Sequence, residues 1–378
     1  MTTDFDIAIC GAGPVGMALA ALLVKQGIAP ARIALIDAKT VEQLARDPRS
    51  IALSYGSRQI LDQIKAWPDA VNPIHQIHVS RRGSFGRTMI DRDELQVPAL
   101  GYVTRYGVLA SSLAQAVTSL GVTILRPAEL VERSERDEAV DLELFDGRKF
   151  SATIAVHAEG GLFSEQTAKT RKHDYDQTAI VAHVRASAPI AHRAFERFTD
   201  EGPLALLPQD DGYALVWCAR PASTEELIGM PDAAFLASLG RAFGTRLGRF
   251  VSVSQRNTFP LGLNANPVTS ARTVAIGNAA QTLHPVAGQG LNLGLRDAVV
   301  LARLLVQDVS PATLQDFAKC RESDRGATIR LTDTMARIFA SAPDGAVSQT
   351  WLGLSLGVMD AINPAKRLLA EQMMFGWR

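Results

Sequence analysis

The sequence GNAAQTLHPVAGQGLN at residues 277–292 carries more information about the fold than any other part of this chain. It lies far downstream of a second glycine-rich sequence, GAGPVG at residues 11–16. Each of the two follows an apolar run of strand length and precedes a run with helical character. The pair predicts one long ligand that is held at two points distant in the sequence.

The upstream sequence has the spacing of a dinucleotide-binding turn. Gly11 permits the tight bend, Gly13 lets the backbone approach a pyrophosphate, and Gly16 lets the helix pack closely on the strand. Pro14 lies in the same turn and belongs to the expected cofactor contacts. Asp37 follows Gly16 by 21 residues at a strand end, where its carboxylate is placed to accept hydrogen bonds from a ribose.

The downstream sequence predicts which dinucleotide is bound. Gly288, Gln289 and Gly290 open a helix that begins near Leu291, so its unpaired N–H groups can face the electron-rich N1 and O2 edge of a reduced flavin. Asn292 belongs to the same expected group. FAD fits both sequences, whereas a nicotinamide dinucleotide would need no second contact. A colourless NAD-linked dehydrogenase is the alternative.

Four further residues complete the predicted site, and two of them have open interpretations. Asn278, after the strand-terminal Gly277, is placed to hydrogen-bond ribitol or pyrophosphate oxygens, and Pro285 holds its neighbours stiffly beside the ring. His284 is either a structural hydrogen-bonding residue or a proton-transfer catalyst, with Pro285 the other catalytic candidate. Arg49 either contacts a phosphate or the flavin, or is a solvated loop residue.

Composition points to a small-molecule partner. The chain has 378 residues with 47% apolar content, and its 39 basic and 39 acidic side chains balance, so no overall field attracts nucleic acid. Cys10, Cys218 and Cys320 are expected to be buried, reduced thiols rather than disulfides or metal ligands. The start of the chain lacks the features of a signal peptide, which predicts a cytoplasmic protein.

The order of patterns predicts an α/β fold in which two domains interleave. A helix is expected over residues 53–66, a hairpin over 142–155, and strands at 180–184, 204–207 and 213–218. The strand at residues 273–276 should return to the first sheet. The predicted parts are a Rossmann-like FAD-binding domain at residues 1–75, 98–170 and 262–345, an antiparallel substrate domain at 76–97 and 171–261, and a helical C-terminal tail at 346–378.

Further sequence blocks carry a resemblance to a known family. RAFERFT at residues 193–199 leads to GPLALLP at residues 202–208, and ESDR follows at residues 322–325. With both glycine-rich sequences, these blocks resemble the flavin-dependent aromatic hydroxylases of the para-hydroxybenzoate hydroxylase type, and within them the ubiquinone-biosynthesis hydroxylases. The chain departs from the wider family at Asn278 and at Glu159, where many members have aspartate.

The resemblance implies an activity. Such enzymes bind FAD, take electrons from NAD(P)H or a redox partner, and react with dioxygen to form a flavin C4a-hydroperoxide that hydroxylates an electron-rich phenol. The implied substrate is a polyprenylated phenol such as a 2-polyprenyl-6-methoxyphenol. Leu206, Pro208 and Trp217 are candidates for the roof of its pocket, with ordinary sheet core as the alternative.

The lipid substrate implies contact with the inner face of a membrane or with other ubiquinone-biosynthesis proteins. The apolar and basic tail at residues 351–377 is a candidate for that contact, with packing on its own domain as the alternative. Two other activities stay open: a related flavoprotein hydroxylase or reductase with a soluble substrate, and a non-catalytic FAD-binding subunit.

Overall fold

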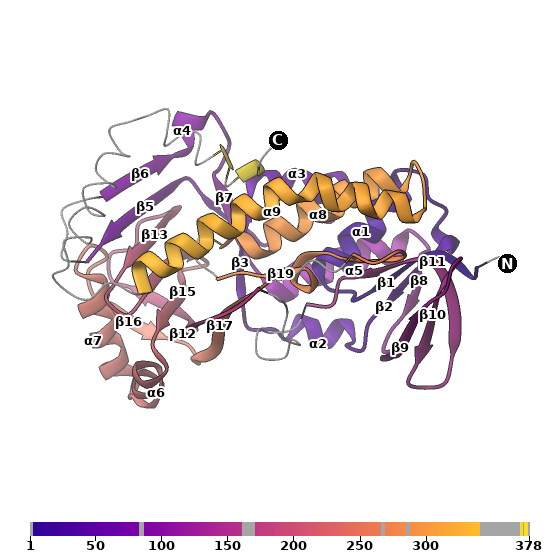
Figure 1. Ribbon diagram of the computed structural model, residues 1–378. Helices are drawn as coiled ribbons and strands as arrows, with labels where there is room; N and C mark the ends of the chain where they lie inside the picture. The colour runs from indigo at the N-terminus through magenta and orange to yellow at the C-terminus, as the bar shows by residue number, and fades with distance from the viewer. Residues whose placement is uncertain are drawn as a thin grey trace.

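The molecule has two parts, each built on its own large sheet (Figure 1). The computed structural model describes residues 3–82, 87–160, 171–265, 269–284, 288–340, 371–372 and 374–376. A long helix, α9 (Pro311–Ala340), runs along both parts and contacts a helix of one and a strand of the other. The expected α/β class with a helical C-terminal region is confirmed.

The first part contains a seven-stranded sheet. Its spatial order is β8 (Thr123–Leu125), β2 (Ile33–Ile36), β1 (Phe5–Cys10), β11 (Lys149–His157), β10 (Val140–Leu144) and β9 (Leu130–Glu135), with β18 (Thr273–Ala275) beside β11. The predicted hairpin is confirmed as β10 and β11, and the predicted return of the chain is confirmed as β18. Because β8, β2, β1, β11 and β18 are parallel, their carboxyl ends meet at one edge.

Both faces of this sheet are covered, which explains why its central strands are apolar throughout. On one face, Ile7 and Ile9 of β1 pack against helices that also contact each other. On the other face, Ala8 and Cys10 pack against the β9–β10 side of the sheet. The helices on the first face are α1 (Pro14–Lys25), α5 (Tyr106–Ser119) and α8 (Gln289–Leu305).

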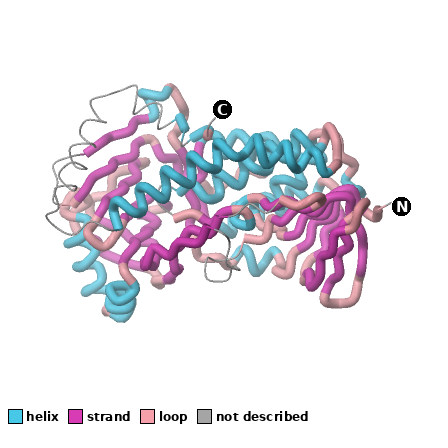
Figure 2. Tube along the Cα trace, in the orientation of Figure 1, coloured by secondary structure: helices cyan, strands magenta, loops and turns pink. Residues whose placement is uncertain are grey.

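The second part contains a nine-stranded, mainly antiparallel sheet, shown with the other elements in Figure 2. All three strands predicted in this region are confirmed within β12, β14 and β15. Its order is β19 (Gln281–Thr282), β17 (Asn257–Ala265), β12 (Arg171–Ala186), β15 (Gly212–Ala219), β14 (Pro203–Gln209), β13 (Arg193–Phe198), β5 (Gln76–Arg81) and β6 (Arg87–Asp91), with β16 (Phe250–Val253) beside β12. Helices α6 (Pro221–Gly229) and α7 (Asp232–Phe243) pack on one face.

The predicted helix at residues 53–66 begins later than expected. Leu53 and Ser54 belong to β3 (Ser50–Ser54), which pairs with β7 (Gly101–Arg105) and so keeps them extended. Helix α3 (Tyr55–Gln63) starts only after Ser54, whose hydroxyl accepts a hydrogen bond from the Ser57 N–H. Strand β7 also pairs with β4 (Asn72–Ile74), which completes a three-stranded sheet. Two short helices, α2 (Val41–Ala45) and α4 (Arg92–Leu95), lie elsewhere in the chain.

Two further expectations need comment. Cys10 and Cys218 are buried as expected, but Cys320 is exposed because it lies beside the exposed Asp316 and Lys319 on α9. The predicted domain boundary at residue 262 falls inside β17, and β19 pairs with that strand.

The C-terminal tail lies mostly outside the described residues. Met374 is buried beside Gly56 of α3, and the ring of Phe375 meets that of Tyr55 edge-on, with 6.2 Å between centroids. These two residues pack on the chain itself. In the described part of the chain, no helix has the length and apolar character needed to cross a bilayer.

Candidate functional site

The glycine turn lies at the edge where the parallel strands end, which is where open α/β sheets bind ligands. Gly11 follows β1 with φ +108°, a conformation that glycine adopts without strain, and its N–H donates to the carbonyl of Ile36. A Cβ on Gly11 would lie 2.5 Å from the backbone of Ala158, and one on Gly16 would lie 1.9 Å from the Gly11 oxygen. The fold itself therefore requires glycine at both positions.

Gly13 differs from its two neighbours. Its backbone is extended, with φ −75° and ψ −177°, which any residue can adopt. A Cβ there would meet only the Tyr106 hydroxyl, at an ordinary 3.6 Å. Neither backbone strain nor internal packing explains the glycine. A ligand that approaches the backbone closely does explain it, so the turn fits the pyrophosphate of FAD.

Asp37 contributes to the architecture of this turn. One carboxylate oxygen accepts hydrogen bonds from the Lys39 N–H, and the other accepts from the Ala12 N–H at 2.7 Å. Arg126 lies 3.3 Å from that second oxygen and donates to the carbonyl of Ala12 at 2.8 Å. The predicted contact of Asp37 with a ribose would therefore be made by a carboxylate that also shapes the turn.

Arg126 is a site residue that sequence reasoning missed. Its side chain is only 7% exposed, and its Nε has no hydrogen-bond partner. The available signal was its position, since it is the first charged residue after the parallel strand β8. An unsatisfied buried donor at the ligand edge suits an anionic or hydroxyl-bearing group of the cofactor.

The two glycine-rich sequences meet in space. The side chain of Val15 fills the volume beside Gly277 and Gly294, where added Cβ atoms would lie 3.2 Å and 2.7 Å from its Cγ2. Asn278 lies beside Gly160, and its Oδ1 faces Gly290 in the first turn of α8, 3.9 Å from where a Cβ would stand. Segments far apart in the sequence therefore form one continuous edge.

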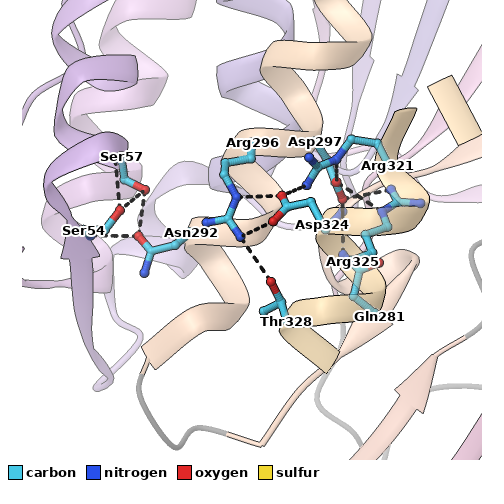
Figure 3. Close-up of polar contacts among 11 residues, drawn as sticks. Ser54, Ser57, Gln281, Asn292, Arg296, Asp297, Arg321, Asp324, Arg325 and Thr328 are labelled. Atoms are coloured by element: carbon cyan, nitrogen blue, oxygen red, sulfur yellow. Dashed lines mark hydrogen bonds and ion pairs between the residues drawn. The ribbon is translucent and has the colours of Figure 1, made fainter. Parts of the chain in front are cut away.

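A buried carboxylate fixes the late loop in this position (Figure 3). Asp297 of α8 is fully buried, and its Oδ2 accepts hydrogen bonds from the Gly277 N–H at 3.1 Å and from Gln281 at 3.2 Å. Arg321 and Arg325 of α9 also donate to it, at 2.7 Å and 2.9 Å. Burial raises the pKa of Asp297, but the charges of Arg325 and Arg321 outweigh that effect and keep the pKa below its usual value.

Asn292 holds the start of α8 against β3. Its Oδ1 accepts from the Ser54 N–H at 2.9 Å and from the Ser57 hydroxyl at 2.7 Å. Its Nδ2 donates to the carbonyls of Ala52 and Gly288. These four bonds saturate the amide, so the predicted contact of Asn292 with the cofactor could use only its backbone or carbon atoms.

The first turn of α8 opens toward an apolar cavity. Gly288 caps the helix with φ +60°, and Leu291 is partly buried against the core of the first part. Gln289 lines a cavity of about 80 Å³ together with Ile77, Ile90 and Leu100. Ile77 and Ile90 belong to the second sheet, so the cavity lies between the two parts of the molecule.

His284 is a buried, neutral imidazole. Its side chain is 1% exposed, its Nε2 lies 3.0 Å from the Gln177 side-chain oxygen, and its ring meets that of Tyr175 edge-on. Burial lowers the pKa of His284 to about 4. This environment matches the structural interpretation better than a group that gains protons near neutral pH. The other catalytic candidate, Pro285, lies outside the described residues.

Arg49 is more ordered than a solvated loop residue. Asp47 binds its guanidinium, with Nη2 and Oδ2 2.6 Å apart. The guanidinium also stacks 4.9 Å from the ring centroid of Tyr106 and 5.8 Å from that of Phe259. Tyr106 is the first residue of α5 in the first part, and Phe259 belongs to β17 of the nine-stranded sheet, so Arg49 bridges the two parts.

The three substrate candidates lie on the far face of the second sheet. Leu206 and Trp217 are in the core under α7, where the ring of Trp217 lies 5.9 Å from that of Phe235. Pro208, two residues beyond Leu206, falls on the same face because side chains alternate along a strand. The alternative interpretation, ordinary sheet core, describes these residues.

The opposite face of the same strands turns toward the first part. Leu207 packs with Val103 of β7, and the Ser50 hydroxyl donates to Gln209 at 3.0 Å. On this face, Glu196 of β13 lies opposite Ala205 of β14. Burial raises the pKa of Glu196 to about 7, with no contribution from a neighbouring charge. Sequence reasoning missed Glu196, although a carboxylate between the aromatic residue Phe195 and Arg197 within a strand was a signal.

The glycine turn generates a first prediction. Gly13→Ala should fold with an unfolding free energy within about 0.5 kcal/mol of the parent once both are stripped of cofactor, because the added methyl finds space. The same variant should lose FAD, measured as flavin absorbance per protein after gel filtration. Gly240→Ala, in an open position of α7, is the control and should keep full flavin content. Full flavin content in Gly13→Ala would show that no pyrophosphate lies there.

The buried ion pairs generate a second prediction. Asp297→Asn should lower the unfolding free energy by about 3–5 kcal/mol, since it leaves the buried Arg325 without its counter-charge and the buried Arg321 with Asp324 alone. Urea denaturation measures this change. Asp316→Asn, at an exposed position on the same helix as the two arginines, should change stability by less than about 0.5 kcal/mol. Equal effects of the two substitutions would contradict the anchoring role of Asp297.

Glu196 generates a third prediction, which concerns pH. Its pKa is about 7 in the folded protein against an ordinary value of 4.5, so the folded state binds this proton more tightly and stability is lost as pH rises between these values. Glu196→Gln should therefore be more stable than the parent above about pH 8, by on the order of 2 kcal/mol, and the difference should vanish near pH 4. Thermal denaturation across pH tests this, with the exposed Glu226→Gln as control. A pH-independent difference would contradict the raised pKa of Glu196.

Comparisons with known proteins agree with this geometry. Residues 4–319 match the family model described as FAD binding domain. Ubiquinone hydroxylase UbiL of Rhodospirillum rubrum is 31% identical, over 98% of this chain and 89% of that protein. The 3-demethoxyubiquinol 3-hydroxylase of Escherichia coli is 33% identical, over 80% of this chain and 79% of that protein.

A solved structure shares the fold. The p-nitrophenol 4-monooxygenase PnpA from Pseudomonas putida superposes with a TM-score of 0.77 at 16% identity, over 100% of both chains. The family match covers most of the sequence, and the relatives match it over most of their own length. The chain therefore belongs to the FAD-binding-domain family, and within it to the FAD-dependent monooxygenases of the ubiquinone-biosynthesis hydroxylase type.

Proposed function

We propose that this enzyme hydroxylates the aromatic ring of a polyprenylated phenol, of the 2-polyprenyl-6-methoxyphenol kind, in ubiquinone biosynthesis. Dioxygen is the co-substrate, and NAD(P)H or a redox partner supplies the electrons. The observation that carries the proposal is the position of the apolar cavity at Gln289, between the first turn of α8 and the second sheet. The names of the relatives from Rhodospirillum rubrum and Escherichia coli support the substrate class.

The residues of the chain would hold FAD along the edge described above. The turn at Gly13 would accept the pyrophosphate, and the free N–H groups at the start of α8 would face the flavin ring. When bound and reduced, FAD supplies the activation of dioxygen. Asp37, Arg126, Asn278 and Arg49 surround this edge and would contribute polar contacts.

The protein must also exclude water and orient the phenol. Ile77, Ile90 and Leu100 give the cavity apolar walls, which suit both a reaction that water would divert and a prenyl chain. Each buried methylene of such a chain contributes about 0.8 kcal/mol. Glu196 lies on the same face of the sheet as Ile77, and its carboxylate would accept the phenolic proton and so make the ring more electron-rich.

A lipid substrate places the enzyme at a membrane surface or beside a partner protein. The predicted contact through the tail at residues 351–377 falls mostly on residues 351–370, 373 and 377, which lie outside the described residues; of the rest, Met374 and Phe375 pack on α3. Two other functions fit the same cofactor site: hydroxylation or reduction of a soluble aromatic compound, and FAD binding without catalysis.

An oxygen assay distinguishes these functions. FAD-loaded enzyme, a reductant and a short-chain prenylated methoxyphenol should consume dioxygen in step with a product one oxygen heavier by mass spectrometry. The same phenol without its prenyl chain should react with a KM at least about tenfold higher, because it loses the apolar contacts. Oxygen consumption that yields only hydrogen peroxide with every phenol would reject the proposed substrate class. A flavin that never reacts would favour the non-catalytic subunit.

A further inference from the structure

A group of arginines lies on the outer face of the second sheet, away from the cofactor edge. Register across three strands brings them together: Arg87 of β6 lies opposite Ser80 of β5, and Ser80 lies opposite Arg197 of β13. Ser80 and His78 point to the face that carries α7, since the ring of His78 lies 5.8 Å from Phe195 in the core under that helix.

Neutral groups contact two of these arginines, Arg197 and Arg246. Arg197 donates to the Ser80 hydroxyl at 3.3 Å and to the carbonyl of Ala242 at 3.2 Å, near the end of α7. Arg246, which follows α7, contacts the Nε2 of His78. His78 is 2% exposed, and its Nδ1 has no hydrogen-bond partner. The guanidinium groups of Arg197 and Arg246 are thus positioned by oxygen and nitrogen acceptors that carry no charge.

No carboxylate neutralises the three guanidinium groups within the part of the chain that the structure describes. Arg87, Arg197 and Arg246 form no ion pair with Asp or Glu there, and the nearby Arg193 reaches Asp91 only through the side chain of Gln76. Residues 83–86, which lie outside the described residues, have the sequence GSFG and so add no charge. A local excess of positive charge therefore exists in a chain whose charges balance overall.

The charges are close enough to perturb one another. Burial and then the charge of Arg246 and Arg82 lower the pKa of Arg197, while burial and then Arg87 and Arg193 lower that of Arg246. For His78, burial and then Arg246, Arg193 and Arg87 lower the pKa to about 4, so this histidine is neutral at physiological pH. Each of these groups would be stabilised by an anion placed among them.

We propose that Arg87, Arg197 and Arg246 form a binding site for a phosphate group. Three guanidinium groups from separate segments can direct paired N–H donors at the oxygens of one phosphate, an arrangement that a carboxylate with two oxygens fills less completely. Arg87 and Arg246 are exposed and Arg197 is half-buried, so a ligand can reach all three. The phosphate could belong to a phospholipid headgroup or to a soluble phosphate ester.

Two binding experiments on the FAD-loaded full chain test the site and identify the source. Calorimetric titration with inorganic pyrophosphate measures soluble phosphate binding. Flotation with phosphatidylcholine vesicles that contain phosphatidic acid measures headgroup binding, and vesicles with oleic acid instead provide surface charge without the added phosphate. Binding of pyrophosphate supports a soluble ester, and preference for phosphatidic acid over oleic acid without pyrophosphate binding supports the headgroup.

Variants test whether these arginines cause the binding of pyrophosphate or of vesicles. Arg197→Gln with Arg246→Gln should weaken binding by at least about tenfold, because it removes two charge-assisted contacts. The control, Arg136→Gln with Arg148→Gln, removes the same charge from exposed ion pairs directly after β9 and in the β10–β11 turn. If the first double variant loses structure, the exposed Arg87→Gln replaces it. The proposal would be overturned if the site variants and the control variant lost equal binding affinity, or if the parent bound neither pyrophosphate nor phosphatidic acid vesicles.

Discussion

The cofactor edge depends on one buried carboxylate. Asp297 receives hydrogen bonds from two arginines of α9, from Gln281 and from the backbone N–H of Gly277. A fully buried charge of this kind is tolerable only because opposite charges and donors surround it. The same interactions fix α8, α9 and the loop after β18 relative to each other. The first turn of α8 is thereby held where the flavin is proposed to lie.

Close backbone packing transmits this constraint to the start of the chain. Val15, in the first turn of α1, fills the space that side chains at Gly277 and Gly294 would occupy. The turn at residues 11–16 and the loop at 277–292 consequently share one edge, although most of the chain separates them. Their contact gives a long dinucleotide one continuous surface. Because a Cβ at Gly13 would find space within the protein, a bound ligand explains this glycine and internal packing does not.

The two faces of the second sheet pack against different parts of the molecule. Leu206 and Trp217 stabilise the core under α7, while Leu207 and Glu196 face the first part of the molecule. Side chains alternate between the two faces along a strand, so a motif such as GPLALLP contains residues of both faces. The proposed phosphate site lies on the α7 side, so it could be occupied without competing for the cavity at Gln289.

The sequence by itself determined the α/β class, the two glycine-rich sequences, the hairpin of β10 and β11 and the return of β18, because these follow from local spacing and periodicity. Only the tertiary structure decided that Asn292 anchors α8 to β3, that His284 is buried and neutral, that Arg126 lies at the glycine turn, and that Glu196 is on the sheet face that turns toward the first part. It also decided that Leu53 is extended and Cys320 exposed. The physical reason is that burial, strand pairing and the direction of a side chain depend on neighbours that are distant in the sequence.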